Sequence, residues 1–348
     1  MAGATPQLIK ELREMTGAGM LDCKNALNET EGDLEKAVQA LREAGLGKAA
    51  KKAGNIAAEG VVAVKVNADN TVATMLELNA QTDFVAKNEN FLNLTQEIVS
   101  HAQANGISDA ETLVASTING MAFPEFLNGK IATIGENLVA RKLVSVKGTV
   151  VNGYVHTNGR VGVLLAATCD ESVKEKAATL LKSIAMHASA MKPTVISYSD
   201  LCPEFVDSEN KAIVAEIIAE NDELKRLGKP LKNIPDFVSK SQLTDEAIAK
   251  AKATFEAELK EQGKPEKIWA NIIPGKIERY ITDNTQLDGR FALLSQAYVM
   301  DDKKTVEQAI AEVDASIKIT EYIRFELGEG IEKKEEDFAA EVAKQMGK

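Results

Sequence analysis

The apolar positions of the first 55 residues recur at helical spacing and predict three short helices. In the first helix the apolar side chains share one face: Leu8, Ile9, Leu12 and Met15. We expect this helix to end at TGAGM, a second to cover residues 20–27, and a third to start at Gly32-Asp33 and stop at Gly45. The run 45–54 is rich in Gly, Ala and Lys, and this composition predicts a linker.

The next part of the chain contains an internal repeat. Residues 59–83 and 147–170 each hold a Gly-led apolar strand, a turn with an asparagine, a second apolar strand and a connector ending in aspartate. A helix follows each copy, and the two helices end alike, in IVSHAQA and IAMHASA. The pattern predicts two related α+β subdomains, each a small antiparallel sheet backed by helices. We expect the segment 130–146 to link them.

The two copies differ where the second strand hands over to the helix. The first copy has TDFVAKNE at this point, and the second has TCDESVKE. Asp83 and Asp170 are both suited to cap the exposed N–H groups of a helix start. Phe84 and Val85 have no apolar counterpart in the second copy. They either pack back on the following helix as a hydrophobic staple, which suits Val85 better than Phe84, or are offered to a partner.

The pattern changes again after residue 200. Residues 210–228 and 244–263 each predict a helix with an apolar stripe and a charged outer face, and each ends in Gly-Lys-Pro. We expect these two helices to form an antiparallel helical hairpin, a coiled-coil arm projecting from the second subdomain. Beyond the arm we expect a short strand at 296–301, a helix at 305–317, a strand at 321–330 and a closing helix at 335–346.

The predicted fold class is therefore α+β, with helical additions. The elements divide the chain into a helical domain with its linker, a first core subdomain, the first part of a second core subdomain, an inserted arm, the return of the second subdomain and a C-terminal helical module. The corresponding residues are 1–55, 56–140, 141–200, 201–290, 291–330 and 331–348.

Charge and cysteine usage narrow the function classes. The formal net charge of -11 argues against direct nucleic-acid binding, because phosphate contacts need clustered Lys and Arg. The three cysteines form no CxxC pair and no histidine stands at ligand spacing, so we expect neither disulfides nor zinc. The first residues predict an amphipathic helix that is neither a signal nor a transit peptide. No apolar run approaches the roughly 18 residues of a membrane span, and we expect a cytoplasmic protein without a membrane partner.

Candidate chemistry is sparse. His101 and His187 occupy equivalent positions in the two repeat helices, so we assign them packing or hydrogen-bonding roles, whereas His156 lies in a hairpin and is expected to be exposed. No histidine pairs with a nucleophile by pattern, and neither GxxxxGK[ST] nor GxGxxG is present. We predict no catalytic residue, no cofactor and no metal. We therefore favour a protein that binds another protein over a metabolic enzyme with an unrecognised site. Such an enzyme would bind a small molecule tightly.

Several strings occur together in one order and are spread over residues 16–333 of the chain: TGAGMLDCKNAL, KAAKKAGNIAAEG, NAQTDFVAKN, IGENL, YVHTNGRVGVLL, IAMHASAMKP and IRFELGEGIEK. In this the sequence resembles the translation elongation factor Ts family, the guanine-nucleotide exchange factors of elongation factor Tu. The resemblance implies a ubiquitin-associated-like (UBA-like) N-terminal domain, a core of two subdomains, a coiled-coil excursion and a C-terminal module. It implies no chemistry of the chain's own.

The resemblance also implies a site. The family's TDFV stretch falls on Thr82, Asp83, Phe84 and Val85. In the family this stretch contacts the GTPase domain of the partner, and its phenylalanine disturbs the Mg²⁺ and β-phosphate site so that GDP leaves. Met20 would add a contact to the same domain and His156 one to a distal domain. The closing helix would pack on the GTPase domain as well.

Three matters stay open at this level. The arm between about residues 202 and 264 is longer than in typical family members, so no arm contact is carried over. Three oligomeric states are open: a one-to-one complex with the partner, a homodimer and a 2:2 complex. The alternative function is that of a UBA-type interaction adaptor without exchange activity.

Overall fold

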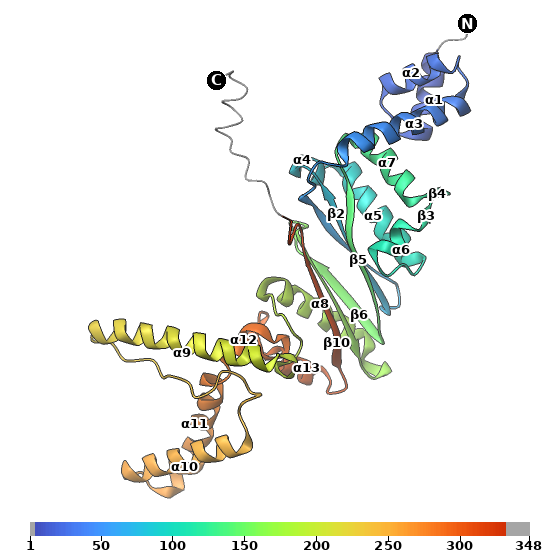
Figure 1. Ribbon diagram of the computed structural model, residues 1–348. Coiled ribbons are helices and arrows are strands. Elements are labelled where there is room, and N and C mark those ends of the chain that lie inside the picture. Colours follow the sequence, from blue (N-terminus) through green and yellow to red (C-terminus); the bar gives the residue numbers. More distant parts are fainter. Residues whose placement is uncertain (1–3, 332–348) are drawn as a thin grey trace, which may run out of the picture. The chain divides into compact units, whose positions relative to one another are not determined.

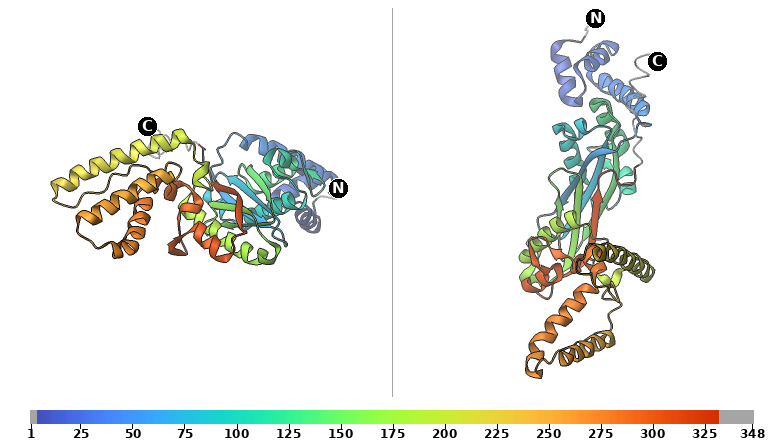
Figure 2. Two further views of the ribbon diagram at one scale, coloured as in Figure 1. Left: turned by 90° about the horizontal axis from the view of Figure 1, so that it is seen from below. Right: turned by 90° about the vertical axis from the view of Figure 1, so that its left-hand side faces the viewer.

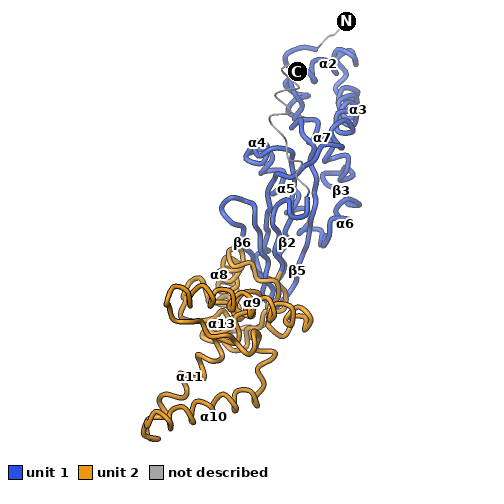
Figure 3. The backbone as a smooth tube through the Cα atoms, turned by 60° about the vertical axis from the view of Figure 1, so that its left-hand side comes forward, with its two compact units in different colours: residues 1–166, 323–348 blue, residues 167–322 orange. Residues whose placement is uncertain are grey.

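A computed structural model describes residues 4–331 of the chain (Figure 1). The closing helix expected at 335–346 lies outside the described residues. The chain forms two compact units, one made of residues 1–166 and 323–348 and the other of residues 167–322 (Figure 3). It passes from the first unit to the second within strand β7 (Val161–Thr168) and returns within β10 (Lys318–Glu326). Each unit is described by itself.

The first unit begins with three helices, as the apolar pattern predicts: α1 (Pro6–Thr16), α2 (Met20–Glu29) and α3 (Leu34–Lys52). They pack around Leu12, Cys23 and Leu27, which are fully buried. The expected stop at Gly45 and the linker after it are wrong, because α3 continues to Lys52. Gly45 and Ala49 are buried, and a Cβ on Gly45 would lie 3.4 Å from that of Ala132 in α7 (Phe123–Ile134). The helix continues through Gly45 because this stretch packs on α7, despite the helix-propensity cost of a glycine, about 1 kcal/mol.

An antiparallel sheet follows, with strand order β1-β2-β5. Strands β2 and β5 are labelled in Figure 1, and Figure 2 shows the same region, blue to green, from two further sides. Its strands are β1 (Glu59–Val66), β2 (Val72–Ala80) and β5 (Val139–Lys147). The segment that we expected to link the subdomains thus contributes β5 to the first sheet, paired with β2. Helix α5 (Glu89–Ala104) packs on this sheet and buries Phe91, Leu94 and Ile98.

The second sheet has the order β10-β7-β6, where β6 is Val150–Val155. The β6–β7 hairpin is followed by a short helical turn and α8 (Lys174–Met191), just as β1–β2 is followed by a turn and α5. This succession agrees with the predicted repeat. Within the first unit the two sheets approach closely at Gly162, where a Cβ would lie 2.5 Å from Val62 Cγ1 and 2.7 Å from Met75 Sδ. Only glycine fits this contact.

The second unit is mainly helical. Besides α8 its larger helices are α9 (Pro203–Arg226), α10 (Asp245–Glu261), α11 (Trp269–Asp283), α12 (Gln286–Phe291) and α13 (Val306–Val313). The strand-like segment after residue 296 forms the two-stranded sheet β8 (Ala297–Tyr298) and β9 (Asp301–Thr305). The first unit also holds three short elements: α6 (Ala110–Val114), β3 (Thr117–Ile118) and β4 (Met121–Ala122).

The arm contains a helical pair, but its members differ from those we expected. Helix α10 packs against α11, with the Lys276 ammonium 2.6 Å from the Glu258 carboxylate and the Phe255 and Tyr280 rings edge to face. The predicted pairing of α10 with α9 is wrong, because the apolar stripe of α9 is buried elsewhere, in a cluster with Val238 and Leu287. Within residues 4–331 no helix is long and apolar enough to cross a membrane.

Candidate functional site

The TDFV stretch forms the turn between β2 and α5, with a four-residue helix, α4 (Asp83–Ala86), at its centre. Thr82 is the N-cap of this helix: its backbone is extended (φ -121°, ψ 155°) and its Oγ1 accepts a hydrogen bond of 3.3 Å from the N–H of Val85. The expected cap, Asp83, is therefore wrong by one residue. Asp83 already belongs to the helix, and its carboxylate accepts a hydrogen bond of 2.7 Å from the Lys87 ammonium, which lowers the pKa of Asp83.

The apolar pair of the turn is divided between the protein and the solvent. Val85 is partly buried and packs against the core cluster of the first sheet, which includes Phe91 and Leu94. Phe84 is 83% exposed. The alternative that the pair packs back on the protein therefore holds for Val85 and is wrong for Phe84. The Phe84 side chain is therefore accessible to a partner.

A carboxylate from a distant segment holds the start of this turn. Glu136 follows α7, and its Oε2 accepts hydrogen bonds of 3.0 Å from the backbone N–H groups of Gln81 and Thr82. Its Oε1 accepts a third, of 2.6 Å, from the Thr82 hydroxyl. Sequence reasoning assigned no role to Glu136, although the IGENL string that contains it contributed to the family resemblance. A contact across 54 residues of sequence leaves no mark in local periodicity.

The neighbours of Glu136 and Gln81 extend this contact into a polar ring. The side-chain amide of Asn137 donates to the backbone carbonyl of Asn55 at 2.8 Å. The side-chain amide of Asn55 in turn donates to Gln81 Oε1 at 3.3 Å. The ring therefore joins the segment after α3, the end of β2 and the turn between α7 and β5.

The corresponding turn of the second copy is built differently. Asp170 precedes a single 3₁₀ turn (Glu171–Val173), but its side chain makes no capping hydrogen bond there, contrary to expectation. Its backbone N–H donates instead to Ser316 Oγ at 3.1 Å. At the position of Phe84 this turn carries Glu171, whose exposed carboxylate lies 3.8 Å from the Lys174 ammonium. This turn exposes charge where the first exposes an aromatic ring.

The two secondary candidates are both exposed. Met20 is the first residue of α2 and is 64% exposed, beside the equally exposed Leu21. His156 lies in the turn between β6 and β7, as expected, with its Nδ1 3.3 Å from the Tyr154 hydroxyl. Both residues are accessible to a partner.

The two repeat-helix histidines have hydrogen-bonding roles, as we predicted. His187 is fully buried, and its Nδ1 accepts a bond of 3.2 Å from the N–H of Val299 while Nε2 lies 3.0 Å from Gln296 Oε1. Because Nδ1 accepts, Nε2 must carry the proton and donate to Gln296. Burial lowers the pKa of His187. His101 Nδ1 lies 3.2 Å from Asn105 Nδ2, and its Nε2 lies 3.4 Å from Ser116 Oγ.

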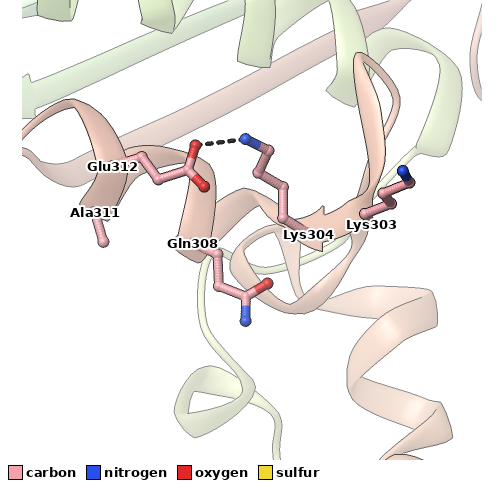
Figure 4. A pocket seen from close by; sticks show the side chains of 5 residues that line it. All are labelled: Lys303, Lys304, Gln308, Ala311 and Glu312. Carbon is pink, nitrogen blue, oxygen red and sulfur yellow. Dashed lines mark hydrogen bonds and ion pairs between the residues drawn. The ribbon is translucent and has the colours of Figure 1, made fainter.

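A hollow between β9 and α13 brings several polar and charged side chains together (Figure 4). It is lined by Lys303, Lys304, Gln308, Ala311 and Glu312. The Lys304 ammonium points to the Glu312 carboxylate and lies 3.1 Å from that of Asp301, and these two acceptors raise its pKa. A lysine held in its charged form is a poor base or nucleophile. Lys304 is therefore not a candidate base or nucleophile in this hollow.

Comparisons with known proteins place the chain among its relatives. A family model described as elongation factor TS matches residues 81–234 and 231–329. The elongation factor Ts of Aliarcobacter butzleri is 81% identical over all of both chains. That of Campylobacter hominis is 54% identical over 99% of each chain, and that of Helicobacter pylori is 54% identical over 99% of this chain and 100% of its own. These relatives align along nearly the whole length of the chain, and the alignments include the residues of the arm.

Proposed function

Because the chain belongs to the elongation factor Ts family, we propose that it binds elongation factor Tu in its GDP-bound and nucleotide-free forms and promotes the release of GDP. The exchange for GTP follows, and the chain itself makes or breaks no covalent bond. It acts in the cytoplasm, where translation elongation takes place. The observation that carries the proposal is Phe84, 83% exposed at the tip of the turn Thr82–Val85.

Exchange requires that the chain bind nucleotide-free elongation factor Tu more tightly than the GDP-bound form. This difference is reciprocal: whatever GDP loses in affinity on binding of the chain, the chain loses on binding of GDP. Phe84 enters the GTPase domain and disturbs the Mg²⁺ and β-phosphate site. Asp83 lies beside it and is exposed. Thr82 and Val85 hold the turn to the protein, since each has a partner within it.

The magnitude of one buried ring shows that Phe84 does not act alone. Full burial of a phenylalanine contributes about 1.5–3 kcal/mol. This corresponds to about 10- to 100-fold in an equilibrium constant, at about 1.4 kcal/mol per tenfold. A larger acceleration needs displaced Mg²⁺ and further anchoring contacts. Met20 and His156, both exposed, are the candidates that we assign to that anchoring.

The proposal is tested by the release of a fluorescent GDP analogue from elongation factor Tu in a stopped-flow instrument. We expect the chain to accelerate release, and Phe84→Ala to reduce the acceleration about 10- to 100-fold. Val114→Ala is a matched control, because Val114 is also an exposed apolar residue (49%) of the first unit, and it should leave the rate unchanged. Binding without any acceleration would identify an adaptor. An unaltered rate for Phe84→Ala would refute the role of Phe84.

A further inference from the structure

The orientation of Phe84 must be set from outside α4. The helix has four residues, far below the length at which a helix is stable by itself. The Phe84 ring is 83% exposed, so packing on the protein cannot fix it. Val85 and Ala86 anchor the end of the turn in the core. The start of the turn, at Gln81 and Thr82, needs a separate anchor.

Glu136 supplies this anchor through three hydrogen bonds of 2.6–3.0 Å to Gln81 and Thr82. Hydrogen bonds to a carboxylate are about twice as strong as those between neutral groups. The third bond also orients the cap. Because the Thr82 hydroxyl donates its hydrogen bond to Glu136, its oxygen lone pairs are oriented to accept a hydrogen bond from the N–H of Val85. One carboxylate therefore fixes two backbone groups and the capping side chain.

Glu136 is itself firmly placed. Gly135 before it ends α7 in the left-handed conformation (φ +87°), with its N–H bonded to the carbonyl of Ile131 at 2.8 Å. Such a φ favours glycine. Leu138 after it is 2% exposed, and the buried Asn137 side chain is bonded to Asn55. The carboxylate thus projects from a segment that is fixed on both sides.

We propose that Glu136 is a positioning residue for Phe84: it clamps Gln81 and Thr82 so that the turn presents the Phe84 ring to the partner in one orientation. Both carboxylate oxygens of Glu136 already accept hydrogen bonds from the turn. Glu136 therefore influences the partner through the position of Thr82 and not by direct contact. This inference rests on the proposed function, because a presented ring matters only if Phe84 acts on the GTPase. It predicts a loss in the rate of release within the complex rather than in formation of the complex.

The clamp can be tested on the free chain, without the partner. The Val85 amide bonds to Thr82, and Thr82 bonds to Glu136, so the protection of that amide reports whether the clamp propagates. We expect Glu136→Ala to speed hydrogen exchange of the Val85 amide at least about tenfold, and Glu136→Gln to speed it less, because an amide oxygen still accepts. Unchanged protection in Glu136→Ala would refute the clamp, whatever the chain does to elongation factor Tu.

A matched control is available in the same unit. Glu97 is also partly buried and accepts a hydrogen bond of 2.7 Å from Asn119, but it does not touch the turn. Glu97→Ala should leave Val85 exchange within about twofold of the unaltered chain. Equal effects of Glu97→Ala and Glu136→Ala would mean that general loosening of the fold, not the clamp, exposes the amide.

The effect on Phe84 is tested by a double-mutant cycle in the GDP-release assay. We expect Glu136→Ala to slow saturated release about tenfold while the half-saturating concentration changes less than about threefold, and Glu136→Gln to recover part of the rate. In a Phe84→Ala background, Glu136→Ala should cost less than about twofold, since the group that it positions is gone. Equal losses in both backgrounds would overturn the proposal. No acceleration by the unaltered chain would instead refute the proposed function and leave the clamp to the exchange data.

Discussion

The two strand-to-helix turns of the repeat share a plan and differ in what they expose. Both follow a β-hairpin and lead into a long helix, α5 or α8. In the first turn, Glu136 and the Thr82 cap hold a short helix that leaves Phe84 83% exposed. The second is a single 3₁₀ turn without a side-chain cap, and it exposes Glu171. A charged residue at this point is therefore compatible with a strand-to-helix connection.

The difference shows which features the fold requires. The second copy forms a connection of the same kind. Among the contacts described for Asp170 to Val173 no carboxylate from a distant segment holds this turn, and the turn has no exposed aromatic residue. The clamp and the exposed ring of the first copy occur together, in a turn that needs neither merely to join its strand to its helix. An extra anchor and an exposed apolar group at one place are expected where a rigid group contacts a partner.

The largest effect is expected when the first turn receives the residue of the second. Phe84→Glu removes the ring and also brings a carboxylate into the contact, so the acceleration of GDP release should fall at least about 100-fold, or about 2.7 kcal/mol. Because residue 84 is exposed, the melting temperature should change little. The reciprocal change, Glu171→Phe, should leave release unaffected. Stopped-flow release and thermal unfolding measure both, and a stable Phe84→Glu protein with full activity would break the comparison.

A smaller effect, on stability, is expected one residue further along. Val85 packs on the first core, whereas its counterpart Ser172 is exposed. Val85→Ser removes partly buried methyl groups and should lower the free energy of unfolding by about 1–2 kcal/mol. Ser172→Val, a surface change, should stay within about 0.5 kcal/mol. Urea unfolding followed by circular dichroism measures both. Equal losses would show that the two turns are packed alike after all.

Local patterns predicted much of the fold. Apolar periodicity located the three N-terminal helices, both hairpins and the helices after them, because each of these elements buries one face along its own length. The repeat also singled out Phe84, since an aligned copy shows which residue a turn of this kind can do without. For this residue the comparison of two segments was more informative than the composition of either.

The structural features that the sequence patterns did not predict depend on contacts between distant segments. Periodicity cannot show that α10 packs on α11 rather than α9, because all three helices have apolar faces. The burial of Gly45 depends on α7, and the clamp depends on Glu136, both remote in sequence. The cap was misplaced from Thr82 to Asp83 because both residue types cap helices and only the backbone decides where the helix begins.

The helices after the two turns extend the comparison to a buried titratable group. His187 in α8 is fully buried, whereas its counterpart His101 in α5 is partly exposed. Burial lowers the pKa of His187, and protonation at Nδ1 would also break the hydrogen bond from Val299. Below a pH of about 6.5 the unfolded chain therefore binds a proton that the folded chain does not, so His187 makes stability fall as the pH falls from there toward its folded pKa.

His187→Gln should remove this contribution while keeping a side chain that can hydrogen-bond to Gln296. Carboxylates that titrate in the same range are common to both proteins, so their effect cancels in the difference between the two stability curves. Above about pH 7 the curves should run parallel, and below about pH 6.5 the unaltered chain should fall more steeply, by at most one proton, or about 1.4 kcal/mol per pH unit. The slopes are measured by urea unfolding at every half pH unit from about pH 7.5 to about pH 5. This range covers the titration of an ordinary histidine. Curves that stay parallel throughout would mean that His187 accepts its proton in the folded chain as readily as in the unfolded one, and burial would then not set its pKa.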